Sequence, residues 1–208
     1  MILAIETSTR EASLAVWDRE GGCVAYESVF TTERAHNAVI FSPVESIVEE
    51  FRDRLSGIIV GLGPGSYGGV RVGIAVANGL SIAMSLPVAG RSSLEAWNTE
   101  SESYFVVGDA RRGSFFVAEV VGRCLQGEPV LIDAGEMEGY LNPLRERGFP
   151  FLTPDPKVTS VIPETCLSFP SAEKLALRFG DSGFETGGIA LEPHYLRAPY
   201  ITFPKGTC

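Results

Sequence analysis

The chain has 208 residues, of which 45% are hydrophobic, and this length suits one large domain or two small ones that need neither disulfides nor metals for stability. Its four cysteines are scattered without a CxxC pair or nearby histidines, which argues against a zinc site and a disulfide framework and favours a reducing, cytoplasmic setting. The formal net charge is −9 with no stripe of Lys and Arg, so the chain is a poor sole binder of nucleic acid, whose affinity rests mainly on phosphate contacts.

Three β-prone segments open the chain. Residues 2–6, 12–18 and 23–31 are apolar and joined by short connections, which predicts antiparallel strands. The charge of Glu6 interrupts the first apolar run, so we expect no signal peptide and no export.

An amphipathic helix is predicted after these strands, because apolar residues recur at i, i+3, i+4 and i+7: Val44, Ile47, Val48 and Phe51. Ser42, Pro43 and Glu45 fit its cap, first position and capping-box partner. Alternatively, the helix begins near His36 and bends at Pro43.

A glycine-rich segment, GLGPGSYGGVRVG at residues 61–73, joins a predicted buried strand at 55–62 to a predicted apolar helix at 70–86. Glycines in such a turn let the backbone approach a phosphate or an adjoining subunit. The dinucleotide pattern requires an acidic residue about 20 positions further on, whereas the next carboxylate is Glu95. The P-loop pattern requires Gly-Lys-Ser or Gly-Lys-Thr, but the basic residue here is Arg71. Both nucleotide motifs are therefore disfavoured.

The helix at 70–86 has little polar face. One stripe contains Ile74, Ala77, Ser81 and Met84, and another contains Val72, Ala75, Val76, Gly79 and Ala83. The uncharged run 72–90 approaches the length of a membrane span, but Asn78 and Pro87 within it favour a buried helix. In a lobe this small, a helix apolar all round is expected to pack on a partner.

The second half of the chain is less regular. A strand and a short helix are expected in 88–97, and a hairpin at 104–121 with Arg111 and Arg112 in its turn. Residues 129–165 are rich in proline and glycine and give no clear prediction, whereas 171–180 predicts a capped helix ending at Gly180. We expect a first lobe of residues 1–100 plus about 171–208, and a smaller second lobe of 101–170.

Several segments, taken in order, resemble one known family: MILAIETST, the helix opened by His36, GLGPGSYGGVRVGIAVANGL, VGDARRGSFFVAEV and EPHYLR. They resemble the TsaB/YeaZ family, the shorter paralogue in the bacterial machinery that makes threonylcarbamoyladenosine in transfer RNA. The resemblance implies an α/β, ribonuclease H-like fold similar to actin, Hsp70 and sugar kinases, with two βββαβα lobes of which the second is reduced. The family more often has Phe-Thr in place of Tyr67 and Gly68, and often Asp in place of Glu6.

The fold also suggests a candidate nucleotide or phosphate loop. In ATPases of this fold, an Asp after the first strand holds a metal and the next turn cradles phosphate. The matching residues here, together with the glycine turn, are Glu6, Thr7, Ser8, Gly63, Gly65 and Ser66. A plain polar turn with local side-chain to backbone bonds remains the other interpretation. No intrinsic cofactor is expected, although ATP or ADP at a subunit interface stays open.

The resemblance implies an accessory subunit and not an enzyme. The catalytic paralogue, TsaD, carries a His-x-x-x-His metal pair, but here His36 is followed by Ile40 at the second position, so no metal is expected. The chain has no zinc ligand set and no GxSxG elbow, which argues against the peptidase activity once attributed to these proteins. The expected role is activation of the complex that modifies adenosine 37 of ANN-decoding transfer RNAs. An independent small-molecule kinase or ATPase is the alternative, and a purely regulatory homodimer is a further one.

The resemblance also implies partners. Members pair through helices of the first lobe, as homodimers and as heterodimers with TsaD, and act with the P-loop ATPase TsaE. Transfer RNA would be reached only through the complex, and no membrane is involved. The candidate contact residues are His36, Val39, Ile40, Ile47, Ile74 and Val76, some of which we expect to face their own sheet.

Overall fold

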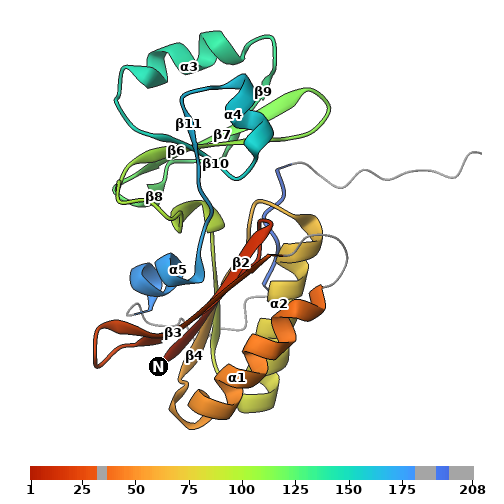
Figure 1. Cartoon of the computed structure of the whole chain (residues 1–208), viewed down its shortest axis with the longest axis vertical. Helices are drawn as coiled ribbons and strands as arrows, with labels where there is room; N and C mark the ends of the chain where they lie inside the picture. Colours follow the sequence, from red (N-terminus) through yellow and green to blue (C-terminus); the bar gives the residue numbers. More distant parts are fainter. Residues whose placement is uncertain (32–36, 181–190, 197–208) are drawn as a thin grey trace, which may run out of the picture.

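The structure, a computed structural model, describes residues 1–31, 37–180 and 191–196 (Figure 1). Two sheets with their own helices lie at opposite ends of the molecule, as Figure 1 shows. His36 and the tail from residue 197 lie outside the described residues.

The first sheet has the order β3-β2-β1-β4-β5. It contains β1 (Ile2–Glu6), β2 (Glu11–Asp18), β3 (Cys23–Thr31), β4 (Gly57–Gly61) and β5 (Val88–Arg91). β1 to β3 are antiparallel as predicted, whereas β4 and β5 run parallel to β1. Every residue of β1 and β4 is buried, because helices cover both faces of the sheet.

Helices α1 (Phe41–Phe51) and α2 (Tyr67–Met84) cover one face of this sheet, and α5 (Ala172–Phe179) covers the other (Figure 1). Alternate residues of β1 serve the two faces: Leu3 and Ile5 pack with α1 and α2, while Ile2 and Ala4 pack with α5. The order βββαβα of the first lobe is therefore as predicted.

The helix ends differ in part from the predictions. A 3-10 turn (Asn37–Ile40) runs into α1, and no side chain caps that helix, so the predicted Ser42 cap is wrong. Ser171 caps α5 as predicted, accepting from the Lys174 N–H at 3.2 Å. Gly180 ends α5 with φ of −60°, so it is not a left-handed stop. Its missing Cβ instead leaves room for the Trp17 ring.

The second sheet has the order β11-β10-β6-β7-β8, with β9 also paired to β7. The predicted hairpin is β6 (Tyr104–Asp109) and β7 (Ser114–Val121). The other elements are β8 (Cys124–Leu125), β9 (Val130–Asp133), α3 (Met137–Arg145), β10 (Phe151–Thr153), α4 (Pro156–Val161) and β11 (Thr165–Leu167). Phe105 and Val107 pack with α3 and α4, whereas Tyr104 and Val106 face Leu94 and Trp97 on the side of the first lobe. Short 3-10 turns at Arg52–Arg54 and Ser93–Glu95 complete the order.

Candidate functional site

The glycine-rich loop after β4 packs directly on the turn after β1. The Ser66 N–H donates to the Ser8 carbonyl oxygen at 2.6 Å, and a Cβ on Gly65 would collide with that same oxygen. The Ser66 hydroxyl caps α2 by accepting from the Gly69 N–H at 3.2 Å. Gly65 is therefore required so that two backbone segments can approach each other.

The same close approach continues along the first turns of α2. A Cβ on Gly69 would meet the Thr7 carbonyl oxygen, and a Cβ on Gly73 would meet the Thr7 hydroxyl. That hydroxyl donates to the Gly69 carbonyl oxygen at 2.8 Å. These contacts join the start of α2 to the turn after β1, at the place where the sequence suggested a phosphate.

Glu6 lies beneath this junction with 0% of its surface exposed. Its Oε1 accepts from the Ser8 N–H at 2.7 Å, whereas Oε2 has no hydrogen-bond partner and rests against Gly61. Burial raises the pKa of Glu6, and the hydrogen bonds from Ser8 offset only part of that effect. Burial therefore favours the neutral form of this carboxyl group over the charged one, and its bond to the Ser8 N–H ties it to the turn.

A cleft of about 690 Å³ separates the two lobes near this junction. Of the six candidate loop residues, Ser8, Gly65 and Ser66 line the cleft, whereas Glu6, Thr7 and Gly63 do not. Gly63 has φ of +85° and donates its N–H to the Ser93 hydroxyl at 3.0 Å. The structure thus brings the six residues together, but it places the acidic one behind the cleft wall.

Cationic and aromatic side chains also line the cleft. Arg10 comes from the first lobe, and Arg111 and Arg112 come from the hairpin of the second. Arg111 pairs with Asp109 at 3.5 Å and is 87% exposed. The sequence offered no indication of a role for Arg10, which directly follows the MILAIETST segment. It offered none either for His194 and Tyr195, although their EPHYLR segment is among those that resemble the family.

The residues present fit a phosphate and metal site of the ATPase kind poorly. Glu6, at the position of the metal-holding acid, does not line the cleft. The space that Gly65 leaves by lacking a Cβ is already filled by the Ser8 carbonyl oxygen, so it is not open to a phosphate. Within the described residues there is no group of three His, Cys, Asp or Glu side chains that could hold a metal ion.

The candidate contact residues on α1 and α2 divide by burial. Ile40, Ile47 and Ile74 lie in the core of the chain itself, so they support the helices from within and cannot contact a partner. Val39 is exposed, and Val76 is partly exposed at the edge of that core. His36 lies outside the described residues.

The outer face of α2 carries an exposed stripe of uncharged side chains, which we call the α2 stripe: Ala75, Gly79, Ile82 and Ala83. Ile82 is 82% exposed, and no atom of the chain lies within 4 Å of the place where a Gly79 Cβ would be. The sequence grouped Ala75, Gly79 and Ala83 with Val72 and Val76 in one stripe of this helix, but it did not single out Ile82. In the part of the chain that the structure describes, no helix is long and apolar enough to cross a membrane.

Comparison with known proteins gives consistent relatives. A sequence model of the family described as TsaD, tRNA N6-adenosine threonylcarbamoyltransferase, matches residues 19–185. The tRNA threonylcarbamoyladenosine biosynthesis protein TsaB of Escherichia coli (strain K12) is 35% identical over 127 residues, which are 57% of this chain and 54% of that protein. The protein of the same name from Bacillus subtilis (strain 168) is 30% identical over 159 residues, which are 73% of this chain and 69% of that protein. The chain thus matches little more than half the length of the Escherichia coli relative.

Two solved structures share the fold. YeaZ from Pseudomonas aeruginosa has a TM-score of 0.66 at 21% identity, covering 94% of this chain and 99% of that chain. A Pseudomonas aeruginosa protein described as similar to peptidase YEAZ has a TM-score of 0.73 at 22% identity, with the same coverage. The predicted two-lobe α/β fold is confirmed as that of YeaZ, and the chain belongs to the TsaB/YeaZ family.

Proposed function

We propose that this chain is a non-catalytic, activating subunit in the cytoplasmic synthesis of N6-threonylcarbamoyladenosine in transfer RNA. It would bind the metal-bearing paralogue TsaD, act with the P-loop ATPase TsaE, and meet transfer RNA only within that complex. The names of the relatives in Escherichia coli and Bacillus subtilis support the pathway. The net charge of −9 supports an indirect route to the RNA, because such a chain attracts phosphate poorly by itself.

The observation that carries the proposal is the α2 stripe. Glycine in the middle of an exposed helix costs stability, roughly 0.5–1 kcal/mol relative to alanine. Gly79 nevertheless stands there, with open space where its Cβ would be. A partner helix that packs closely on the stripe would explain both this glycine and the exposure of Ile82, since small residues let two helices approach. Phe41 and Val39, at the start of α1 and in the 3-10 turn before it, are further exposed apolar residues of this lobe.

Two features support a non-catalytic role. Ile40 is buried at the position where the paralogue's second metal-binding histidine would fall, so a metal pair with His36 cannot form. Glu6 is buried beneath the loop junction and does not line the cleft, so it cannot act on a substrate bound there. Both support a chain that acts by binding, with the chemistry carried by another subunit.

The alternative, an independent kinase or ATPase, has less support because Gly65 and Gly69 of the loop already lie against the chain's own backbone. ATP or ADP at a subunit interface stays a prediction. Calorimetry with millimolar ATP on the isolated chain and on the mixed subunits separates these cases. Binding by the isolated chain, with turnover, would favour the alternative.

Reconstitution tests the proposal. The rate of threonylcarbamoyladenosine formation is measured with TsaD, TsaE and the enzyme that makes the adenylate, with and without this chain. We expect a large loss of rate on omission, and the same loss with Ile82→Glu, which places a charge on the α2 stripe. A matched Val161→Glu variant, exposed on α4 of the second lobe, serves as the control. An undiminished rate without the chain would rule out the activating role.

A further inference from the structure

A short segment near the end of the described chain runs along the large cleft, between α2 and the second sheet (Figure 1). Residues 191–196, which we call the cleft strap, form no helix or strand, and His194, Tyr195 and Leu196 line the cleft. At one end, Leu191 packs against the core of the first lobe. At the other end, Leu196 packs against the apolar cluster that the second sheet turns toward the first lobe. The strap therefore joins the two lobes through side-chain contacts.

One aromatic contact fixes the strap to the first lobe beside the glycine-rich loop. The Tyr195 ring stacks on the ring of Tyr67, the first residue of α2, with 5.5 Å between the centroids and 27° between the planes. The Arg71 guanidinium lies 5.0 Å from the centroid of the Tyr67 ring and supports it. Within the residues that the structure describes, the strap backbone makes one hydrogen bond, from the His194 N–H to the Leu62 carbonyl oxygen at 2.8 Å. Because so few backbone bonds hold it, the strap can detach without unfolding either lobe.

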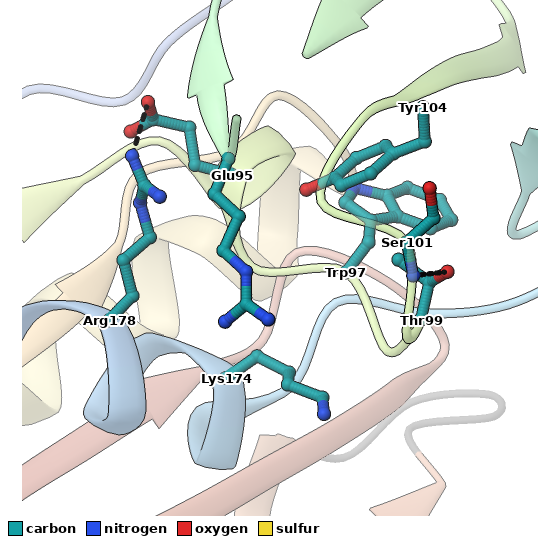
Figure 2. Close-up of a pocket in the computed structure, with 8 residues that line it drawn as sticks. Glu95, Trp97, Thr99, Ser101, Tyr104, Lys174 and Arg178 are labelled. Atoms are coloured by element: carbon teal, nitrogen blue, oxygen red, sulfur yellow. Dashed lines mark hydrogen bonds and ion pairs between the residues drawn. The ribbon is translucent and has the colours of Figure 1, made fainter. Parts of the chain in front are cut away.

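Two connections between the lobes, one after β5 and one before α5, lie together. The Asn98 N–H of the first donates to the Phe169 carbonyl oxygen of the second at 2.9 Å. Figure 2 shows Glu95 of the first connection paired with Arg178 of α5, at 3.5 Å. These connections therefore lie beside α5, whereas the strap is fixed to α2 on the opposite face of the first sheet. Connections gathered on one side act as a hinge unless a contact on the other side holds the lobes.

From this arrangement we propose that the cleft strap sets how far the two lobes open, and that the stacking of Tyr195 on Tyr67 is its releasable latch. Both rings remain partly in solvent, since Tyr67 is 57% exposed and Tyr195 is 46% exposed, so separating them uncovers little further apolar surface. With the latch released, the second lobe would turn about the paired connections and the cleft would widen. A molecule that binds at the start of α2 and displaces Tyr195 would therefore open the cleft. This inference does not depend on the proposed role in transfer RNA modification.

Fluorescence quenching of the full chain tests the strap. The chain has two tryptophans, and Trp17→Phe leaves Trp97, which lines the cleft and is 4% exposed, as the single reporter. We expect acrylamide to quench this reporter more strongly in Tyr195→Ala, because release of the strap uncovers the cleft wall. Tyr195→Phe keeps the stacked ring and is the matched control, so its quenching should equal that of the unaltered strap. Circular dichroism establishes that each variant is folded.

The distance between the lobes gives a second readout, for which both tryptophans stay in place. Cys23 on β3 and Cys166 on β11 are exposed and can carry spin labels once Cys124 and Cys208 are replaced by serine. We expect Tyr195→Ala to shift and broaden the distribution of distances between the two labels, and Tyr195→Phe to leave it unchanged. Equal quenching in the two variants, or equal distance distributions, would each overturn the proposal.

Discussion

Replacing Gly79 by alanine should stabilise the isolated chain and weaken its association with the partner. Gly79 lies within α2, is exposed, and has no atom of the chain within 4 Å of its would-be Cβ. The change therefore adds helix propensity without any clash, which is worth about 0.8–1 kcal/mol. For a chain of 150–250 residues, about 1 kcal/mol raises the melting temperature by roughly 2–4 °C.

The effect on association has the opposite sign, because the added side chain occupies the space that a partner helix would use. Overpacking a well-packed contact costs about 1–3 kcal/mol. With leucine in place of Gly79, we expect the dissociation constant for TsaD to rise by roughly 5–150-fold, the factor that corresponds to this energy. Alanine should show a smaller rise in the same direction.

Gly139 provides the matched control. It lies in α3 of the second lobe, is exposed, and likewise has no atom within 4 Å of its would-be Cβ. Gly139→Ala should stabilise the chain, and neither Gly139→Ala nor Gly139→Leu should alter binding. Scanning calorimetry gives the melting temperatures and isothermal titration gives the affinities. The reasoning is refuted if Gly79→Leu binds TsaD as tightly as Gly139→Leu does.

Three further predictions concern the loop junction. Gly65→Ala should destabilise the chain by about 1–3 kcal/mol in urea unfolding, because the new methyl group meets a backbone carbonyl. The control Gly68→Ala should be neutral or stabilising in the same assay, because its methyl group meets nothing within 4 Å. Ser66→Ala should lower the free energy of unfolding by about 1 kcal/mol, because it removes the cap of α2. Ser42→Ala should change it little, because Ser42 does not cap α1. Equal losses of stability in the two variants would contradict this account. The raised pKa of Glu6 means that its contribution to stability is fully present below the ordinary value of 4.5 and is lost as pH rises through the folded-state pKa. Glu6→Gln should therefore gain stability relative to the unaltered chain as pH rises from acid to neutral. Parallel stability profiles in urea unfolding would contradict the raised pKa.

Much of the first lobe could be predicted from the sequence, because its strands and helices have long, regular apolar patterns. The strand predicted at 55–62 is shorter, Gly57–Gly61, since the Leu55 N–H still closes the preceding helix on the Phe51 carbonyl. In the second lobe the elements between 129 and 165 were missed. Their strands have three or four residues, and α3 contains both Gly139 and Pro143, so no periodic signal could develop.

The sequence singled out the glycine turn and the turn after β1, which the structure places against each other, but it did not reveal what each residue contacts there. The glycines were correctly singled out, although what a Cβ would meet depends on the turn after β1, which lies more than fifty residues earlier in the chain. The contact residues on α1 and α2 show a similar limit. A helix that is apolar on every side does not reveal which stripe faces its own sheet, so buried Ile74 and exposed Ile82 could not be told apart from the pattern.

Binding to TsaD through the outer face of α2 is tested most directly by light scattering. The molar mass of this chain is measured alone and after mixing with TsaD from the same source, for the unaltered chain and for Ile82→Glu. We predict that the unaltered chain forms a heteromeric complex and that Ile82→Glu stays separate while keeping its own fold. A mass that does not change on mixing the unaltered chain with TsaD would contradict the activating role, and a complex formed equally well by Ile82→Glu would show that the contact lies elsewhere.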